Sequence, residues 1–228
     1  MNLSELMGHL RCSVLRDDAK PYLWQDIELV RFLNQAESDF ARRTHCLIDD
    51  ESTFTTLTTV IGQSTYTLDD RIIFVKELGL VLDDGEGNLT YRELGDKTRH
   101  QQRDNYAQGC PYSYNLQVAR NKLRLYPVPD AEYTIKLSVA RKPLRAMSNP
   151  KDVPEIPEEW HLCLCDYAAG RALINNDPER ANMQSKNEFM ASWDLHVRDA
   201  KREFTNLRSG VTPRARTNWT GKRWGTYF

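Results

Sequence analysis

Apolar positions recur with helical spacing at the start of the chain. In residues 2–15 they form one stripe, which predicts a short amphipathic helix. Residues 24–46 predict a second, longer helix with one apolar and one solvated side. The members of the first stripe are Leu3, Leu6, Met7, Leu10 and Val14. The apolar side of the second helix comprises Trp24, Ile27, Val30, Leu33, Asn34 and Phe40. Its solvated side comprises Glu28, Arg31, Gln35 and Arg42.

The pattern changes at residue 53, where Thr, Val, Ile and Tyr become frequent. Residues 53–68 predict two short strands on composition, with a turn at Gly62-Gln63 between them. Residues 71–82 continue in the same β style, and the run DDGEGN at 83–88 predicts a turn. Residues 89–110 are polar, and the run DKTRHQQRDNYAQG at 96–109 fits either a short helix or a long loop.

Strict alternation of apolar and polar positions follows in three runs, at residues 112–118, 123–125 and 133–139. The first two runs are separated by a turn near Asn121. Such alternation is typical of strands with one buried face. Together the runs predict an antiparallel meander.

Helical features return after a linker at residues 148–157 that contains three prolines. The helix that starts near Pro157 is unusually apolar. Its small residues Ala168, Ala169 and Gly170 predict close packing against neighbouring helices. Asp177 and Pro178 predict the start of a last helix, over residues 178–206, that leaves the helical conformation at Ser209-Gly210.

These elements predict an α+β fold in which two helical segments flank a β insertion. Residues 1–52 and 150–206 are expected to form a helical bundle. Residues 53–149 are expected to form an antiparallel β domain inserted into that bundle. Residues 207–228 follow as an extended C-terminal arm.

Composition changes this picture only locally. The 228 residues carry a net charge of −1, which gives no general indication of nucleic-acid or membrane binding. Residues 1–52, however, hold ten acidic and six basic side chains, whereas residues 206–228 hold five basic and no acidic ones. The chain is therefore polarised, with an acidic beginning and a basic end.

Cysteine usage and hydropathy bear on the compartment. The five cysteines are odd in number, and their spacing fits no disulfide framework. The sequence shows no signal peptide and no apolar run near the roughly 18 residues of a membrane span. We expect a protein of the reducing cytoplasm without a membrane partner.

A search for chemistry finds no catalytic constellation. Cys163, Cys165 and His161 are the closest Cys/His group, but helical positions two apart point about 200° from each other, so both thiols cannot bind one metal. We interpret them as thiols buried in an apolar helix. No nucleophile motif, phosphate-binding loop or HExxH motif occurs. We expect no cofactor, no metal and no enzymatic activity.

The C-terminal arm combines basic and aromatic residues. A solvated, disordered tail is one interpretation, but such tails are poor in aromatics. Trp, Tyr and Arg dominate protein interfaces, which favours docking onto another protein. Binding of nucleic acid is the alternative function, because Arg and aromatic rings also stack on bases. The candidate partner-binding residues are Arg208, Arg214, Arg216, Trp219, Lys222, Arg223, Trp224, Tyr227 and Phe228.

Three stretches resemble the head-to-tail adaptor (connector) proteins of tailed bacteriophages, in particular the tail tubular or adaptor proteins of short-tailed phages. Residues 21–47 resemble the N-terminal helical segment of that group, with Trp24 and the run Asp26-x-Glu28-Leu29. TVIGQSTYTL at 59–68 resembles its Gly-Gln-x-x-Tyr-x-Leu strand turn. IPEEWHLCLCDYAAGRAL at 156–173 resembles its Pro-x-x-aromatic-His helix.

The resemblance implies a structural virion protein at the head–tail interface, assembled in the host cytoplasm. It implies twelve copies in a ring beneath the portal protein, tail nozzle or tail tube proteins as further partners, and genomic DNA passing through the lumen. The arm agrees with this picture, because a segment that orders on contact can wrap a large surface during assembly.

Overall fold

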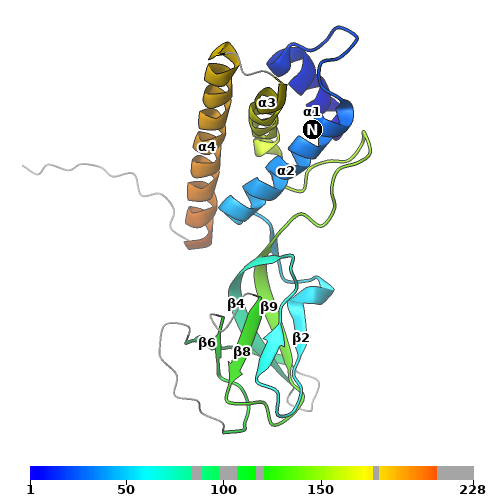
Figure 1. Ribbon diagram of the computed structural model, residues 1–228. Coiled ribbons are helices and arrows are strands. Elements are labelled where there is room, and N and C mark those ends of the chain that lie inside the picture. The colour runs from blue at the N-terminus through cyan, green and yellow to red at the C-terminus, as the bar shows by residue number, and fades with distance from the viewer. Residues whose placement is uncertain (84–88, 98–106, 117–120, 177–179, 210–228) are drawn as a thin grey trace, which may run out of the picture.

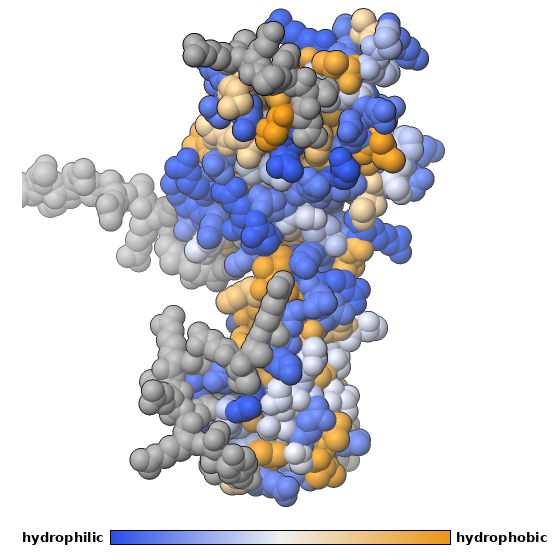
Figure 2. Space-filling view, viewed as in Figure 1, coloured by the Kyte–Doolittle hydropathy of each residue, from blue (hydrophilic) through white to orange (hydrophobic). Residues whose placement is uncertain are grey.

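Helices and strands segregate into two parts that meet end to end in this computed structural model (Figure 1). Hydrophilic and hydrophobic residues are interspersed over the visible face of both parts (Figure 2). The structure describes residues 1–83, 89–97, 107–116, 121–176 and 180–209. Among these, residues 1–47 and 142–209 are called the helical part, and residues 48–141 the β part. The predicted α+β class is confirmed.

The helical part begins with α1 (Leu3–His9), which continues directly into the π-helix η1 (Leu10–Leu15). A capping box starts α1: the Asn2 side chain accepts a hydrogen bond from the Glu5 amide, and the Glu5 carboxylate accepts one from the Asn2 amide. The remaining helical elements are α2 (Asp26–Thr44), the 3₁₀ turn η3 (Glu158–Trp160), α3 (Cys163–Asn176) and α4 (Arg180–Ser209). The predicted helices are therefore present.

One buried cluster draws on all four α-helices, with Trp193 and Phe40 among its largest fully buried members. The small residues of α3 let α4 approach closely. Ala168, Ala169 and Gly170 are all buried, and a Cβ on Gly170 would lie 2.8 Å from Met190 Sδ. The close packing predicted for this helix is confirmed.

The β part contains two sheets. One has the order β1-β9-β4-β5, with β2 also paired to β9, and the other has the order β3-β8-β7-β6. The strands are β1 (Ile48–Asp49), β2 (Thr56–Thr58), β3 (Thr65–Thr67), β4 (Ile72–Asp83), β5 (Leu89–Glu93), β6 (Gly95–Asp96), β7 (Ser113–Asn115), β8 (Lys122–Tyr126) and β9 (Thr134–Arg141). A 3₁₀ turn, η2 (Thr53–Thr55), precedes β2. Buried residues of both sheets form one core, which includes Leu78, Leu125 and Ile135.

The strand pairing corrects the predicted meander. β7 and β8 pair antiparallel, but β9 belongs to the other sheet, where it pairs with β4, β1 and β2. Alternation shows which face of a strand is buried, and the inner faces of both sheets cover the same core. The pattern therefore cannot tell the sheets apart. One pair in this antiparallel fold, β6 with β7, is parallel.

The turn at Gly62 is confirmed, with φ of +77°, a conformation that glycine adopts readily. Its flanking strands β2 and β3 lie in different sheets. The uncertain stretch 89–110 contains the strands β5 and β6, while residues 98–106 and most of the predicted DDGEGN turn, 84–88, lie outside the described residues. β1 lies inside the range 1–52 that was expected to be helical.

Candidate interaction surface along helix α2

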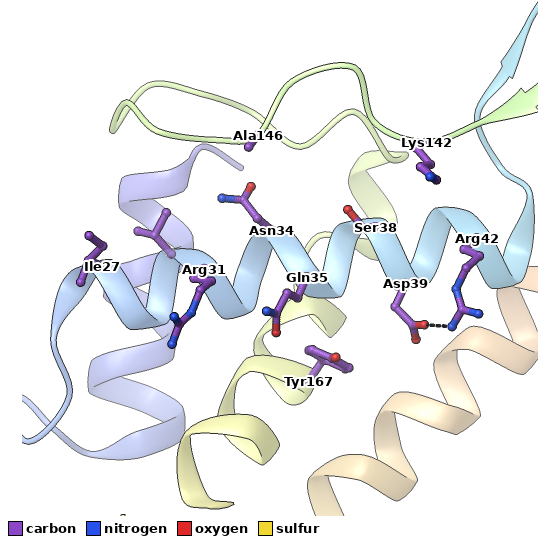
Figure 3. Close-up of a pocket in the computed structure, with 11 residues that line it drawn as sticks. Ile27, Arg31, Asn34, Gln35, Ser38, Asp39, Arg42, Lys142, Ala146 and Tyr167 are labelled. Atoms are coloured by element: carbon purple, nitrogen blue, oxygen red, sulfur yellow. Dashed lines mark hydrogen bonds and ion pairs between the residues drawn. The ribbon is translucent and has the colours of Figure 1, made fainter. Parts of the chain in front are cut away.

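A groove runs along the outer side of α2 (Figure 3). α2 forms its floor, the linker after β9 borders one side, and Tyr167 of α3 borders the other. The groove encloses about 680 Å³. Its lining comprises Ile27, Val30, Arg31, Asn34, Gln35, Ser38, Asp39, Arg42, Lys142, Ala146 and Tyr167.

Helical periodicity separates the two sides of α2. Phe32, Leu33 and Phe40 are buried in the helical core. Ile27, Arg31, Gln35, Ser38 and Arg42 follow one another at spacings of three or four residues, which places them on a single outer face.

Ile27 corrects one detail of the sequence prediction. It was expected on the apolar, packed side of the helix, yet 75% of it is exposed. Trp24, three residues earlier, is buried, and its indole N–H donates to the Ala172 carbonyl of α3 at 3.2 Å. Ile27 instead lines the groove, together with Val30.

The linker wall is fixed to α2 by a reciprocal amide clasp. Asn34 Nδ2 donates to the Met147 carbonyl at 2.9 Å, and the Met147 amide donates to Asn34 Oδ1 at 2.8 Å. Met147 is itself buried in the helical core. The neighbouring Ala146 is therefore held at the rim of the groove.

The groove has a basic character. Asp39 pairs with Arg42 within the groove, and with Arg43 at 3.6 Å outside it. Arg31 and Lys142 are exposed and make no ion pair with any residue that the structure describes. The lining thus carries three cationic side chains and one carboxylate.

A second cleft adjoins the groove where α2 meets the β part. It encloses about 840 Å³ and shares Arg42 and Lys142 with the groove. Its other lining residues are Thr67, Asp70, Ile72, Ile73 and Asn121. Asn121 Nδ2 donates to the Asp70 carboxylate across it. The groove and the cleft together reach from the start of α2 to the β part.

A polar network joins the two parts close to this surface. The Glu155 amide donates to the buried Glu37 carboxylate of α2 at 2.6 Å. Arg141, at the end of β9, binds the Glu155 carboxylate at 2.5 Å and Asp49 of β1 at 2.8 Å. Burial, together with the nearby negative charge of Glu155, raises the pKa of Glu37 to about 7.

The cysteines predicted to be buried thiols are buried, which confirms that interpretation. Cys163 donates to the Trp160 carbonyl at 2.9 Å, and Cys165 lies 3.8 Å from the Leu6 carbonyl. Burial, followed by the nearby Asp166 carboxylate, raises the pKa of Cys165 to about 12, so its thiol is protonated at neutral pH. His161 is also buried, with Nε2 2.9 Å from the Ile156 carbonyl oxygen. Within the described part of the chain, no cluster of three or more His, Cys, Asp or Glu residues suits a metal ion.

The predicted C-terminal arm falls almost entirely outside the described residues. Arg208 lies in α4, which ends at Ser209, where the sequence predicted the helix to stop. The other eight candidate contacts, from Arg214 to Phe228, belong to residues 210–228 and are not described. Their role in partner binding stays a prediction.

Comparison with known proteins decides the family. A family model described as SU10 adaptor protein matches residues 1–216. The chain belongs to the SU10 adaptor family. No curated protein matches the chain. Membership of the SU10 adaptor family supports a phage adaptor that is structural rather than enzymatic. No helix among the described residues is long and apolar enough to cross a membrane.

The match of this SU10 adaptor family member covers both parts and extends into the predicted arm as far as Arg216. The candidate partner-binding residues predicted from the sequence all lie on the arm, and none of them lines the groove. Asn34 is the residue of the sequence that could have indicated this surface, because it is polar on the expected apolar side of α2. In the structure its side chain binds the backbone of the linker at Met147.

Proposed function

We propose that the protein is a head-to-tail adaptor subunit that joins the portal to the tail of a phage virion. The observation that carries the proposal is the family match over residues 1–216, and the form of the molecule supports it. The helical part and the β part lie at opposite ends of an elongated subunit (Figure 1). A subunit of that form offers separate surfaces to two different partners.

In this proposal the helical bundle, residues 1–52 and 150–206, and the arm, residues 207–228, dock on the portal. The β domain, residues 53–149, meets the tail nozzle, a tail tube protein or a neighbouring subunit. Twelve copies form a ring through heterologous contacts, and the genome passes through its lumen during ejection. Assembly takes place in the host cytoplasm.

The arm is suited to long reach. α4 ends on the side of the helical part that faces the β part (Figure 1). Residues 210–228 comprise 19 residues, and a fully extended chain of that length spans up to about 65 Å. Twelve such arms acting on one ring would bind multivalently, which strengthens attachment without new kinds of contact.

Deletion of residues 207–228 tests this function. We expect the truncated protein to keep its folded core, measured by circular dichroism and thermal melting, and to be lost from DNA-filled heads, measured by quantitative mass spectrometry of purified particles. A matched control replaces the arm by a linker of the same length made of Gly and Ser. Normal incorporation of the truncated protein would show that the arm does not make the portal contact.

A comparison of the intact and the truncated protein tests the alternative function, the binding of nucleic acid by the arm. Binding to phosphates weakens steeply as salt rises. If the arm binds DNA as its main task, the intact protein retards duplex DNA at low salt and the truncated protein does not. We expect no such difference at low salt, where contacts to phosphates are strongest.

A further inference from the structure

The groove along α2 combines apolar residues on its floor and both sides with uncompensated positive charge. Ile27 and Val30 on α2, Ala146 on the linker and the Tyr167 ring line it. Single exposed apolar residues are common on protein surfaces, but these four lie in one hollow. A partner that fills the hollow removes this apolar surface from water.

The positive charges come from two different elements of the groove. Arg31 projects from α2, whereas Lys142 stands on the linker (Figure 3). Neither has an ion-pair partner in the described part of the chain, and Asp39, the one carboxylate in the lining, is shared by Arg42 and Arg43. Carboxylates of an incoming segment would therefore find two cations free to pair with them.

The walls are preformed. The clasp between Asn34 and Met147 fixes the linker, and α2 is a regular helix that packs on the core. Little chain needs ordering when a partner binds, so the entropy cost falls mainly on the incoming segment. Ile27 and Arg42 are fifteen positions apart on the helix, about 22 Å. That distance matches about seven residues of extended chain.

Three occupants can be compared on these grounds. The arm of another copy carries five basic residues and no acidic residue, so Arg31 and Lys142 repel it. Duplex DNA offers phosphates, but its charged outer surface covers the apolar side chains of Ile27, Val30 and Ala146 poorly. An acidic protein segment with interspersed apolar side chains can cover the apolar residues of the groove and pair its carboxylates with Arg31 and Lys142.

We propose that the α2 groove binds an acidic, partly apolar segment of a partner protein. This inference rests on the proposed function, in which that partner is the portal. The groove and the arm then bind the partner at two points. The groove binds an acidic segment of the partner, whereas the arm contacts the partner with basic and aromatic residues.

Photo-cross-linking identifies the occupant. The photoreactive residue p-benzoylphenylalanine replaces the exposed groove residue Gln35, and in the control it replaces Lys201, which is exposed on α4. Assembled virions are irradiated, and cross-linked peptides are sequenced by mass spectrometry. We expect Gln35 to capture an acidic segment of the portal, whereas Lys201 does not.

The outcomes separate the two proposals. Capture of an acidic segment of another virion protein supports the groove inference and overturns its assignment to the portal. Capture of residues 210–228, capture of DNA, or no capture from Gln35 in intact virions overturns the groove inference. None of these results alters the test of the proposed function, which deletes the arm.

Charge reversal gives an independent measure. The double variant Arg31→Glu/Lys142→Glu should lower incorporation into heads at least tenfold. The single variant Arg31→Lys keeps both positive charges and should be incorporated as the wild type is. Arg145→Glu, on the same linker but outside the groove lining, is the control and should incorporate normally. Thermal melting confirms that each variant folds. Wild-type incorporation of the folded double variant, or an equal loss for Arg145→Glu, contradicts the inference.

Discussion

The helical part and the β part build their cores from different kinds of side chain. Aromatic rings pack at the centre of the helical core: the ring centroid of Trp193 lies 5.9 Å from that of Phe40 and 5.2 Å from that of Tyr167. Small residues let the surrounding helices approach closely. The core of the β part is mainly aliphatic and draws on alternate positions of opposed sheets, such as Leu125 and Ile135. Large aromatic rings thus pack beside small alanines and leucines in the first core, whereas medium-sized aliphatic side chains dominate the second.

The two clusters of buried residues have no member in common, so neither core extends into the other part. What connects the parts, besides the chain itself, includes the polar network of Glu37, Glu155, Arg141 and Asp49. Charged contacts of this kind depend on pH, whereas the burial of apolar side chains does not. The comparison therefore predicts two units that respond separately to core damage and a joint that responds to charge.

The largest effect is expected from the centre of the helical core. Trp193→Ala leaves a cavity among aromatic rings and should destabilise the helical part by about 3–5 kcal/mol. Amide hydrogen exchange followed by mass spectrometry should show faster exchange in α3 and α4, with protection in β4 and β9 retained.

Two variants control this experiment. Leu195→Ala, at a position that is half exposed, should change the free energy of unfolding by less than about 0.5 kcal/mol. Leu125→Ala, in the core of the β part, should give the reverse pattern of exchange. Equal loss of protection in both parts for either core variant would show that the two cores unfold as one unit.

A smaller effect is expected at the joint. Arg141→Ala removes the shared partner of Asp49 and Glu155 and leaves both carboxylates without that cation, a loss of about 1–3 kcal/mol. Denaturation in urea should then resolve two transitions, one for each part, or widen the separation between them. Arg145→Ala, on the exposed linker, is the control. Unchanged transitions for Arg141→Ala would mean that the network does not couple the parts.

The smallest effect concerns pH. Glu37 has a pKa of about 7 in the folded protein and near 4.5 when unfolded, so the native state holds an extra proton between these values. This contribution to stability is greatest at low pH and is lost as the pH rises through 7, about 1 kcal/mol between pH 6 and pH 8.

Glu37→Gln should flatten that dependence, because the amide cannot ionise yet keeps an oxygen to accept from the Glu155 amide. Urea midpoints at pH 6 and pH 8 measure the difference. Glu51→Gln, at an exposed carboxyl, should leave the wild-type dependence in place. A Glu37→Gln protein that still loses stability from pH 6 to pH 8 as the wild type does would assign the effect to another group.

The sequence predicted much of the fold at the level of single elements. α2, α3 and α4 were expected close to their observed positions, and the close packing at Gly170 followed from small residues alone. The sheet partners were predicted less well, because β9 was joined to β7 and β8 instead of to β4. The candidate site was predicted only as the arm, so the groove was missed.

By itself, the sequence determined the helices and most of the strands, which side of most of them is apolar, and that the thiols of Cys163 and Cys165 are buried. These properties depend largely on neighbours along the chain, so the spacing of apolar and polar positions predicts them. Only the tertiary structure decided that β9 joins β4, that Asn34 holds the linker, and that Ile27 and Arg31 share a groove with Lys142. These are contacts between residues far apart in sequence, and a local pattern shows that a face is available without showing what covers it.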